Sequence, residues 1–226
     1  MAAPFEVKVH DVHIADHEEL AFEVETNLYR PKANESVNAN VFQTRLELGY
    51  GLTKNSEMGI NFYLSNYNGG NYFNGGKLSY LFAPSRDEGE FLNYGLKLEV
   101  NYINDIDGVQ NNFYEITPII ALQHKSWRFT FNPSIDIAIS NDKKTTFSPS
   151  AKVAYSLNNR AAVGLEYYVD NLPFDGSSGI HQQPNAAYLV TDYKYKKSSF
   201  NVGVGRGVAT STDAWVLKLI AALAFN

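Results

Sequence analysis

Apolar and polar residues alternate one by one along almost the whole chain, and this period of two is the strongest constraint on its fold. In the stretch FLNYGLKLEVNY (91–102), the even-numbered positions are leucine, valine and tyrosine, while Lys97, Glu99 and Asn101 occupy odd-numbered positions. Successive side chains of a β-strand point to opposite faces, so this pattern predicts strands with one apolar and one polar face. The closing stretch WVLKLIAALAFN (215–226) follows the same rule.

The pattern predicts about twelve strands between residues 18 and 225, within a range of ten to fourteen. Short polar connections (TKNSE, HKS, NNR, KKSS and the slightly longer APSRDEGE) alternate along the chain with longer ones (RPKANESV, NYNGGN, NDIDGVQ, NDKKTT, NLPFDGSSGIHQQP and ATSTDA). Sequential hairpins place alternate connections at opposite ends of a sheet. We therefore expect one end with mostly short turns, near both chain termini, and one end with mostly longer loops.

Two architectures fit such strands, a soluble sandwich and a transmembrane barrel. Four features favour the barrel: glycines crowd the polar row, the strand number is even, the apolar row carries almost no charge, and aromatic residues mark the strand ends. Arg206, at a strand end, is the main charged exception. The aromatic residues are Tyr50, Phe82, Tyr102, Tyr114, Trp127, Tyr155, Tyr193 and Trp215. Membrane barrels carry such aromatic girdles at both interfaces. We therefore predict an all-β fold, a single closed antiparallel transmembrane β-barrel.

Composition excludes several classes of protein. The net charge of −5 argues against nucleic-acid binding, which requires a basic face. The absence of cysteine excludes disulfides and thiolate metal sites. The chain has no apolar run of 18 or more residues, so it has no candidate helical membrane span.

The end of the chain resembles the C-terminal assembly signal of Gram-negative outer-membrane β-barrels, an alternating apolar strand that ends in an aromatic residue. Here Asn226 follows Phe225, whereas most members of that class end on the aromatic residue itself. Residues 18–225 as a whole, with the opening HIADHEELAFEVETNLYR, are similar to small porin-like barrels of about twelve strands. The resemblance implies a location in the outer membrane of a Gram-negative bacterium. It also implies contact with outer-membrane lipid and lipopolysaccharide, and with the barrel-assembly machinery.

This interpretation divides the chain into residues 1–17, an N-terminal periplasmic tail or small plug, and residues 18–226, the barrel. The polar rows then face the lumen. The predicted pore-lining residues are Glu23, Arg45, Glu47, Lys97, Glu99, Glu115, Arg128, Asp136, Lys152, Glu166 and Lys218.

The positions of the turns predict which of these charges lie opposite one another, because the turn sets the register of a hairpin. We expect Glu23 opposite Arg45, and a run of neighbours in which Glu99 lies near Glu115 and Glu115 near Asp136. The run continues from Asp136 to Lys152 and from Lys152 to Glu166. Each register is open to a slip of two residues. Acidic residues outnumber basic ones along the inward rows.

A barrel of about twelve strands lies between eight-stranded barrels, which side chains fill, and wide porins. We therefore expect a narrow pore for passive passage of small solutes or ions, weakly cation-selective because of its acidic excess. One alternative is a closed-lumen structural or interaction barrel. A less favoured one is a lipid-modifying enzyme, because we find no histidine on a predicted strand wall and no Gly-x-Ser-x-Gly segment. We expect no enzymatic activity and no cofactor.

Three of the five histidines, His10, His13 and His17, lie close together in HDVHIADH (10–17). On a helical turn such spacing would bring imidazoles together as metal ligands. Scattered polar residues of a flexible tail explain the same pattern, and we favour that explanation. His124 and His181 are expected in a turn and a loop.

Overall fold

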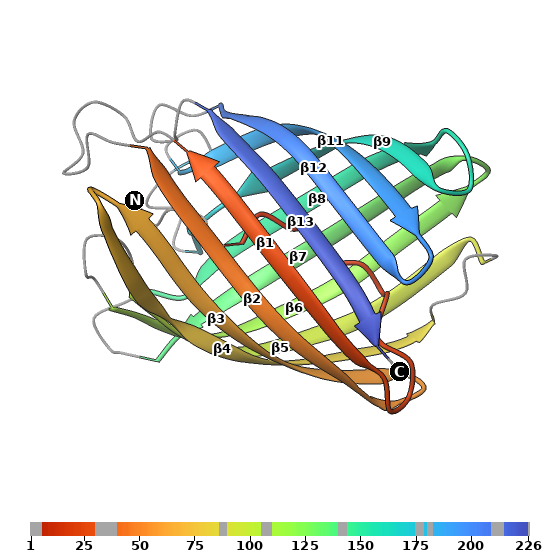
Figure 1. The fold of residues 1–226 in the computed structure, drawn as a ribbon, viewed down its shortest axis with the longest axis horizontal. Coiled ribbons are helices and arrows are strands. Elements are labelled where there is room, and N and C mark those ends of the chain that lie inside the picture. The colour runs from red at the N-terminus through yellow and green to blue at the C-terminus, as the bar shows by residue number, and fades with distance from the viewer. Residues whose placement is uncertain are drawn as a thin grey trace.

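The computed structural model describes residues 6–29, 40–85, 90–104, 110–139, 144–174, 179, 183–208 and 215–225 of the 226 residues. These residues form one antiparallel sheet whose strands follow the chain as successive hairpins (Figure 1). The strands are β1 (Leu20–Tyr29), β2 (Val41–Thr53), β3 (Ser56–Tyr67), β4 (Gly70–Ser85), β5 (Leu92–Asn104), β6 (Gln110–His124), β7 (Trp127–Ala138), β8 (Thr146–Ser156), β9 (Ala161–Val169), β10 (Leu172–Pro173), β11 (Asn185–Tyr195), β12 (Ser198–Gly207) and β13 (Val216–Phe225).

The sheet closes on itself through the pairing of β1 with β13, in which Leu20 lies opposite Phe225 and Tyr29 opposite Val216. Pairing of β8 with β9 completes the ring, so twelve strands form the wall. The short strand β10 lies in the stretch predicted as a loop and adds to the end of β8. The prediction of a closed antiparallel barrel is confirmed. Within the described part of the chain, no helix is long and apolar enough to cross a membrane.

The two ends of the barrel differ as expected, with one exception. Short turns join β2 to β3, β6 to β7 and β11 to β12 at the end where Leu20 and Phe225 lie. We call this the turn end and the opposite end the loop end. The exception is NYNGGN, which was expected to be a longer loop. It forms a two-residue turn in which Asn68 and Gly69 both have positive φ (49° and 78°), because Asn-Gly suits the tight turn that matches strand twist.

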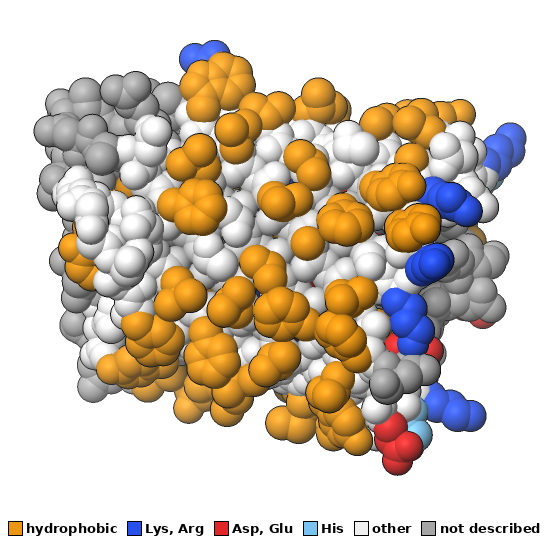
Figure 2. Space-filling model, viewed as in Figure 1, with side chains coloured by type: hydrophobic (Ala, Val, Ile, Leu, Met, Phe, Trp, Pro, Cys, Tyr) orange, Lys and Arg blue, Asp and Glu red, His pale blue; other side chains and the backbone are white. Residues whose placement is uncertain are grey.

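The outer wall of the barrel is apolar (Figure 2). Leu98, in the middle of β5, is 40% exposed, and the predicted aromatic residues are all exposed on the same face. Tyr50, Trp127 and Tyr155 lie near the turn end, whereas Tyr102, Tyr114 and Trp215 lie near the loop end. Arg206, the charged exception on the apolar row, stacks on Trp215 with 5.5 Å between the guanidinium carbon and the ring centre. It therefore lies at the border of the apolar band.

Polar and charged side chains fill the interior instead. Arg45, Gln43 and Glu25 are fully buried inside the ring, although strands of a soluble protein would expose such residues. Small residues leave room for large ones: Gly205 lies directly beneath the ring of Tyr188, where a β-carbon would overlap the ring. An apolar outside and a polar inside identify the fold as a transmembrane β-barrel.

A charge on the outer wall tests this orientation. The substitution Leu98→Arg, at the middle of β5, should lower the free energy of unfolding in lipid vesicles by about 2–4 kcal/mol, since the guanidinium would enter hydrocarbon. The matched control is Tyr102→Arg on the same face of the same strand but near the loop end, which should cost about 0–1 kcal/mol. Equal costs at both positions would contradict the proposed depth of β5.

Candidate functional site: the lumen

The eleven residues predicted to line a pore all project to the inside of the barrel. Six are buried: Arg45, Glu47, Lys97, Glu99, Glu166 and Lys218. The others are half-buried: Glu23, Glu115, Arg128, Asp136 and Lys152. Sequence reasoning missed Glu25, Lys77 and Asp192, which share the same inward rows. The parity of their positions is the signal that identifies them, because each lies an even number of residues from another inward side chain.

Two of the predicted registers are wrong. Glu25, not Glu23, lies opposite Arg45, and Glu23 lies opposite Glu47. Lys152 lies opposite Thr130, whereas Asp136 lies opposite Thr146. In both hairpins the centre of the loop is displaced from the position assumed from the sequence, which shifts the register by twice the displacement. The pairs Glu99–Glu115, Glu115–Asp136 and Lys152–Glu166 are as predicted.

Residues 6–19, which we call the lumen segment, run inside the barrel (Figure 1). The segment passes close to Gly51 near the turn end, where the Glu18 N–H donates to the Gly51 carbonyl (2.8 Å) and the Gly51 N–H to the Glu19 carbonyl (3.0 Å). A β-carbon at Gly51 would overlap the backbone of Asp16, so this entry requires glycine. The described N-terminal part of the chain therefore turns away from the turn end and back into the lumen.

Side chains of the wall satisfy the backbone of the lumen segment. The Val7 N–H donates to Glu25, and Lys218 Nζ donates to the Val7 carbonyl (2.9 Å). Asn132 accepts from the His10 N–H (2.7 Å) and donates to the His10 carbonyl (3.1 Å). The Ala15 N–H donates to Glu57 Oε2 (2.6 Å). Because buried backbone groups need partners, these contacts hold the segment in a defined path.

Apolar contacts anchor the lumen segment at two levels. Val7 packs into a cluster with Tyr29, Val41 and Tyr188 on one side of the interior. Val12 packs against Leu81, Ala83 and Ile119 on the other. The segment therefore crosses the lumen from one apolar patch to the other.

Several buried charges inside the barrel form ion pairs with one another. Arg45 forms ion pairs with Glu23, Glu25 and Glu47 on the wall and with Glu6 of the lumen segment. Lys218 and Lys152 pair with Glu166, and Lys152 also with Asp192 (2.8 Å). Arg128 pairs with Asp11 of the lumen segment. Removing one partner would leave an uncompensated buried charge, which costs much more than an exposed pair contributes.

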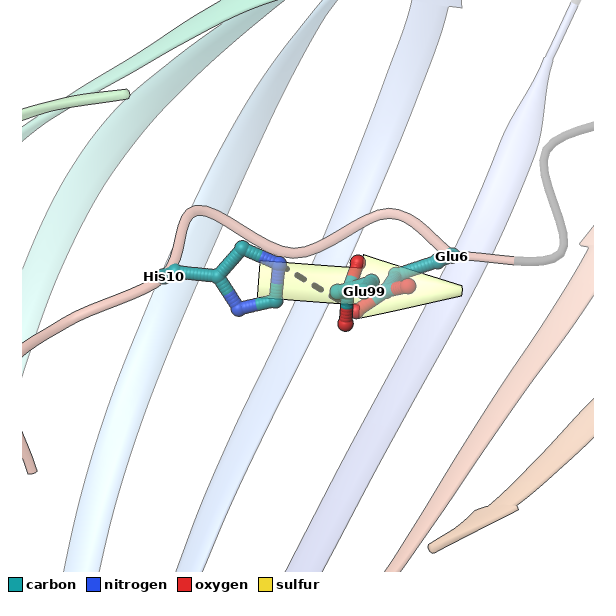
Figure 3. A group of neighbouring side chains, drawn as sticks. All are labelled: Glu6, His10 and Glu99. Atoms are coloured by element: carbon teal, nitrogen blue, oxygen red, sulfur yellow. Dashed lines mark ion pairs between the residues drawn. The ribbon is translucent and has the colours of Figure 1, made fainter. Parts of the chain in front are cut away.

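Glu6, His10 and Glu99 converge in the middle of the lumen, and such a trio could in principle hold a metal ion (Figure 3). The ammonium groups of neighbouring lysines lie where such an ion would bind. Lys97 Nζ lies 2.8 Å from Glu99 Oε1 and 3.3 Å from His10 Nδ1, and Lys77 Nζ lies 2.7 Å from the same Glu99 oxygen. Lysines this close would repel a divalent cation, so we assign the group to the ion-pair network.

The other histidines do not join this trio. His13 Nδ1 lies 3.7 Å from Asp11 Oδ1, and exposed His17 lies 3.9 Å from Glu18. His10, His13 and His17 thus have different partners, because the segment is extended rather than helical. His124, expected in a turn, is the last residue of β6 and is exposed. Its side chain has no hydrogen-bond partner among the described residues. His181 lies outside the described residues.

Two cavities lie on either side of the lumen segment, and both are lined by Lys8 and His10. The cavity toward the turn end has a volume of about 760 Å³ and carries side chains of both charges. The cavity toward the loop end has a volume of about 280 Å³ and contains Glu115, Asp136 and Asp170. Among the described residues these three carboxylates form no ion pair, although Ser148 donates to Asp136 (2.6 Å) and Thr117 to Glu115 (2.7 Å). Burial and the neighbouring Asp136 raise the pKa of Asp170, which follows β9, to about 7.

Solved structures share this fold at low sequence identity. An outer-membrane channel from Pseudomonas putida F1 is 15% identical, with a TM-score of 0.63 over 97% of this chain and 100% of the other. The KdgM porin is 10% identical, with a TM-score of 0.61 over 91% and 99%. Outer-membrane phospholipase A from Escherichia coli is 10% identical, with a TM-score of 0.52 over 97% and 95%. No protein-family model and no curated protein matches the sequence. The likeness establishes the fold, that of an outer-membrane β-barrel, as the sequence predicted.

Acid should weaken the docking of the lumen segment. Burial and Lys97 hold the pKa of His10 well below its ordinary value of 6.5, so His10 docks in its neutral form. A free segment takes up a proton below about pH 6.5 and the docked one does not, so docking weakens as the pH falls through that value. Despite its burial, Glu6 has its pKa held well below 4.5 by Arg45, Lys77 and Lys97, and it adds to the effect below that pH.

We therefore expect single-channel conductance in planar bilayers to rise between pH 7 and pH 5. The substitution His10→Asn removes the titrating group but keeps the backbone contacts with Asn132, and it should abolish the rise. His17→Asn, which changes an exposed histidine of the same segment, is the control and should leave it intact. A rise that persists in His10→Asn would contradict this account.

Proposed function

We propose that this protein forms a narrow channel for passive passage of small solutes across the outer membrane, and that the lumen segment acts as a small plug that keeps it narrow. The observation that carries the proposal is the pair of cavities that lie on either side of the lumen segment. Eight-stranded barrels are filled by their own side chains, whereas this twelve-stranded wall leaves space for solute at both ends. A closed structural barrel would not require such cavities.

The plug is thin, and it is held by contacts that water can replace. Several of these contacts are charge-assisted, including the pair between Lys8 Nζ and Glu23 (2.8 Å) and that between Arg128 and Asp11. Water from either cavity can hydrate these groups if the segment moves. The conducting path therefore widens when the segment shifts, without any change in the wall.

The proposal does not include catalysis. Lipid hydrolysis in a barrel wall requires a nucleophile whose base is within hydrogen-bond reach. The described histidines either dock in the lumen, as His10 does, or lack a serine partner, as His124 does.

The outer surface of the barrel indicates which molecules surround it. We propose that the apolar band contacts membrane lipid, and that the loop end meets lipopolysaccharide, since longer loops face the cell exterior in such barrels. The strand from Val216 to Phe225 closes the ring and presents its apolar face outward. We propose that the barrel-assembly machinery recognises this strand.

Deleting residues 1–17 tests the plug. We expect a several-fold increase in single-channel conductance, because the two cavities would merge. The control is deletion of residues 1–5, which leaves the described contacts of the lumen segment in place and should conduct like the full chain. A full-length protein that is silent in planar bilayers, or a deletion with unchanged conductance, would overturn the proposal.

We further propose that the channel is weakly cation-selective, because Glu115 and Asp136 line the loop-end cavity and form no ion pair among the described residues. Reversal potentials under a KCl gradient should show cation preference, and the double substitution Glu115→Gln, Asp136→Asn should reduce it. The control, Asp16→Asn with Glu18→Gln, removes the same charge from the exposed turn and should leave the preference unchanged. Anion preference in the native protein would contradict the proposal, as would unchanged selectivity in the first variant.

A further inference from the structure

Three prolines occupy one level of the barrel wall on neighbouring strands. Pro118 lies in β6, Pro133 in β7 and Pro149 in β8. Pro133 is the direct partner of Pro149, and the register between β6 and β7 places Pro118 opposite Pro133. Proline cannot donate a backbone hydrogen bond and is rare in the interior of a sheet. A row of three therefore marks a weak part of the wall.

The pairing between β6 and β7 is interrupted at this row. Partners run up to Ile116 and Ile135, and they resume at Ile120 and Phe131. The register is the same on both sides of the gap, so the gap is not a β-bulge. Among the described strand pairs, this is the one interruption that leaves the register unchanged. We call residues 117–119 and 132–134 the seam.

The seam lies at the depth of hydrocarbon. Exposed Tyr114, toward the loop end, and exposed Trp127, toward the turn end, border it on the outer face. Lipid offers no hydrogen bonds, so backbone groups at this depth are normally paired within the sheet. A break in pairing is tolerated in a barrel where the other side of the wall is a polar interior.

Side chains close the seam on its lumen side. The hydroxyl oxygens of Thr117 and Ser134 lie 2.8 Å apart and are hydrogen-bonded across it. Asn132 holds the backbone of His10, so the lumen segment docks directly on the seam. Ile119 packs against Val12 of the same segment. Movement of the segment would therefore uncover the seam and an apolar patch beside it.

We propose that the seam is a lateral passage through which small, uncharged and largely apolar solutes leave the lumen for the interior of the bilayer. The inference rests on the proposed channel, because a solute must first enter the lumen. The patch of Leu81, Ala83 and Ile119 offers apolar contact inside, and the lipid-facing prolines continue that surface outside. Opening of the seam requires the Thr117–Ser134 hydrogen bond to break. It breaks no backbone hydrogen bond between β6 and β7, because these strands are not paired along the seam.

A disulfide across the seam tests the passage. The chain has no cysteine, and residues 117 and 134 are directly opposite one another, so Thr117→Cys with Ser134→Cys can form one defined bond. The probe is N-phenyl-1-naphthylamine, whose fluorescence reports entry into a bilayer. In cells that express the variant, oxidation should slow probe entry several-fold and reduction should restore it, while single-channel conductance of the purified protein stays unchanged. The matched control is Ser199→Cys with Ala222→Cys, across the continuous pairing of β12 with β13.

A second pair of variants needs no disulfide. Pro118→Val with Pro133→Val supplies the missing donors to the seam and should also slow probe entry several-fold. Pro149→Val, whose pairing with β7 is already continuous, is its control. Unchanged probe entry in both seam variants would overturn the lateral passage while the channel stands. An equal loss of conductance and probe entry would also overturn it, since the solute would then use the axial route. A native protein without conductance would instead refute the channel itself.

Discussion

Hydrocarbon forms no hydrogen bonds, so a chain that crosses it must pair its backbone groups within its own structure. The rest of this fold depends on that constraint. An open sheet of twelve strands would leave two unpaired edges in lipid, and the pairing of β1 with β13 removes them. The apolar outer wall and the polar interior follow from closure, because alternate side chains of each strand then face lipid and lumen. The seam between β6 and β7 stands out against this background because its pairing is incomplete where the constraint is strictest.

Closure creates a second requirement inside the ring. Inward rows bring Arg45, Lys97 and Lys218 into a confined space where charges need partners. The wall provides several, and the lumen segment provides the others through Glu6 and Asp11. The segment therefore completes the interior electrostatically while it divides the lumen into two cavities. Because its contacts are mostly polar, they can be exchanged for water more readily than the packing of an apolar core.

Much of this structure was predictable from the alternation of apolar and polar residues along each strand. The strands, the closed barrel and the inward position of all eleven charged residues follow from alternation, which is a local property. The registers were less predictable. Glu25 lies opposite Arg45, and Asp136 lies far along the strand from Lys152, because each register depends on the course of a loop that hydrophobic period does not describe. The tight turn at Asn68 and Gly69 was misjudged because its length was inferred from polar composition rather than from the Asn-Gly pair.

The sequence by itself thus determined which face of each strand meets lipid, since exposure to hydrocarbon selects residue types position by position. It also determined the closing strand, through the apolar row that ends at Phe225. The tertiary structure alone decided where residues 6–19 lie, because their pattern has no period and their partners, such as Asn132 and Lys218, come from distant strands. It also aligned Pro118 with Pro133 and Pro149, since residues on three strands share one level only after register and closure are set.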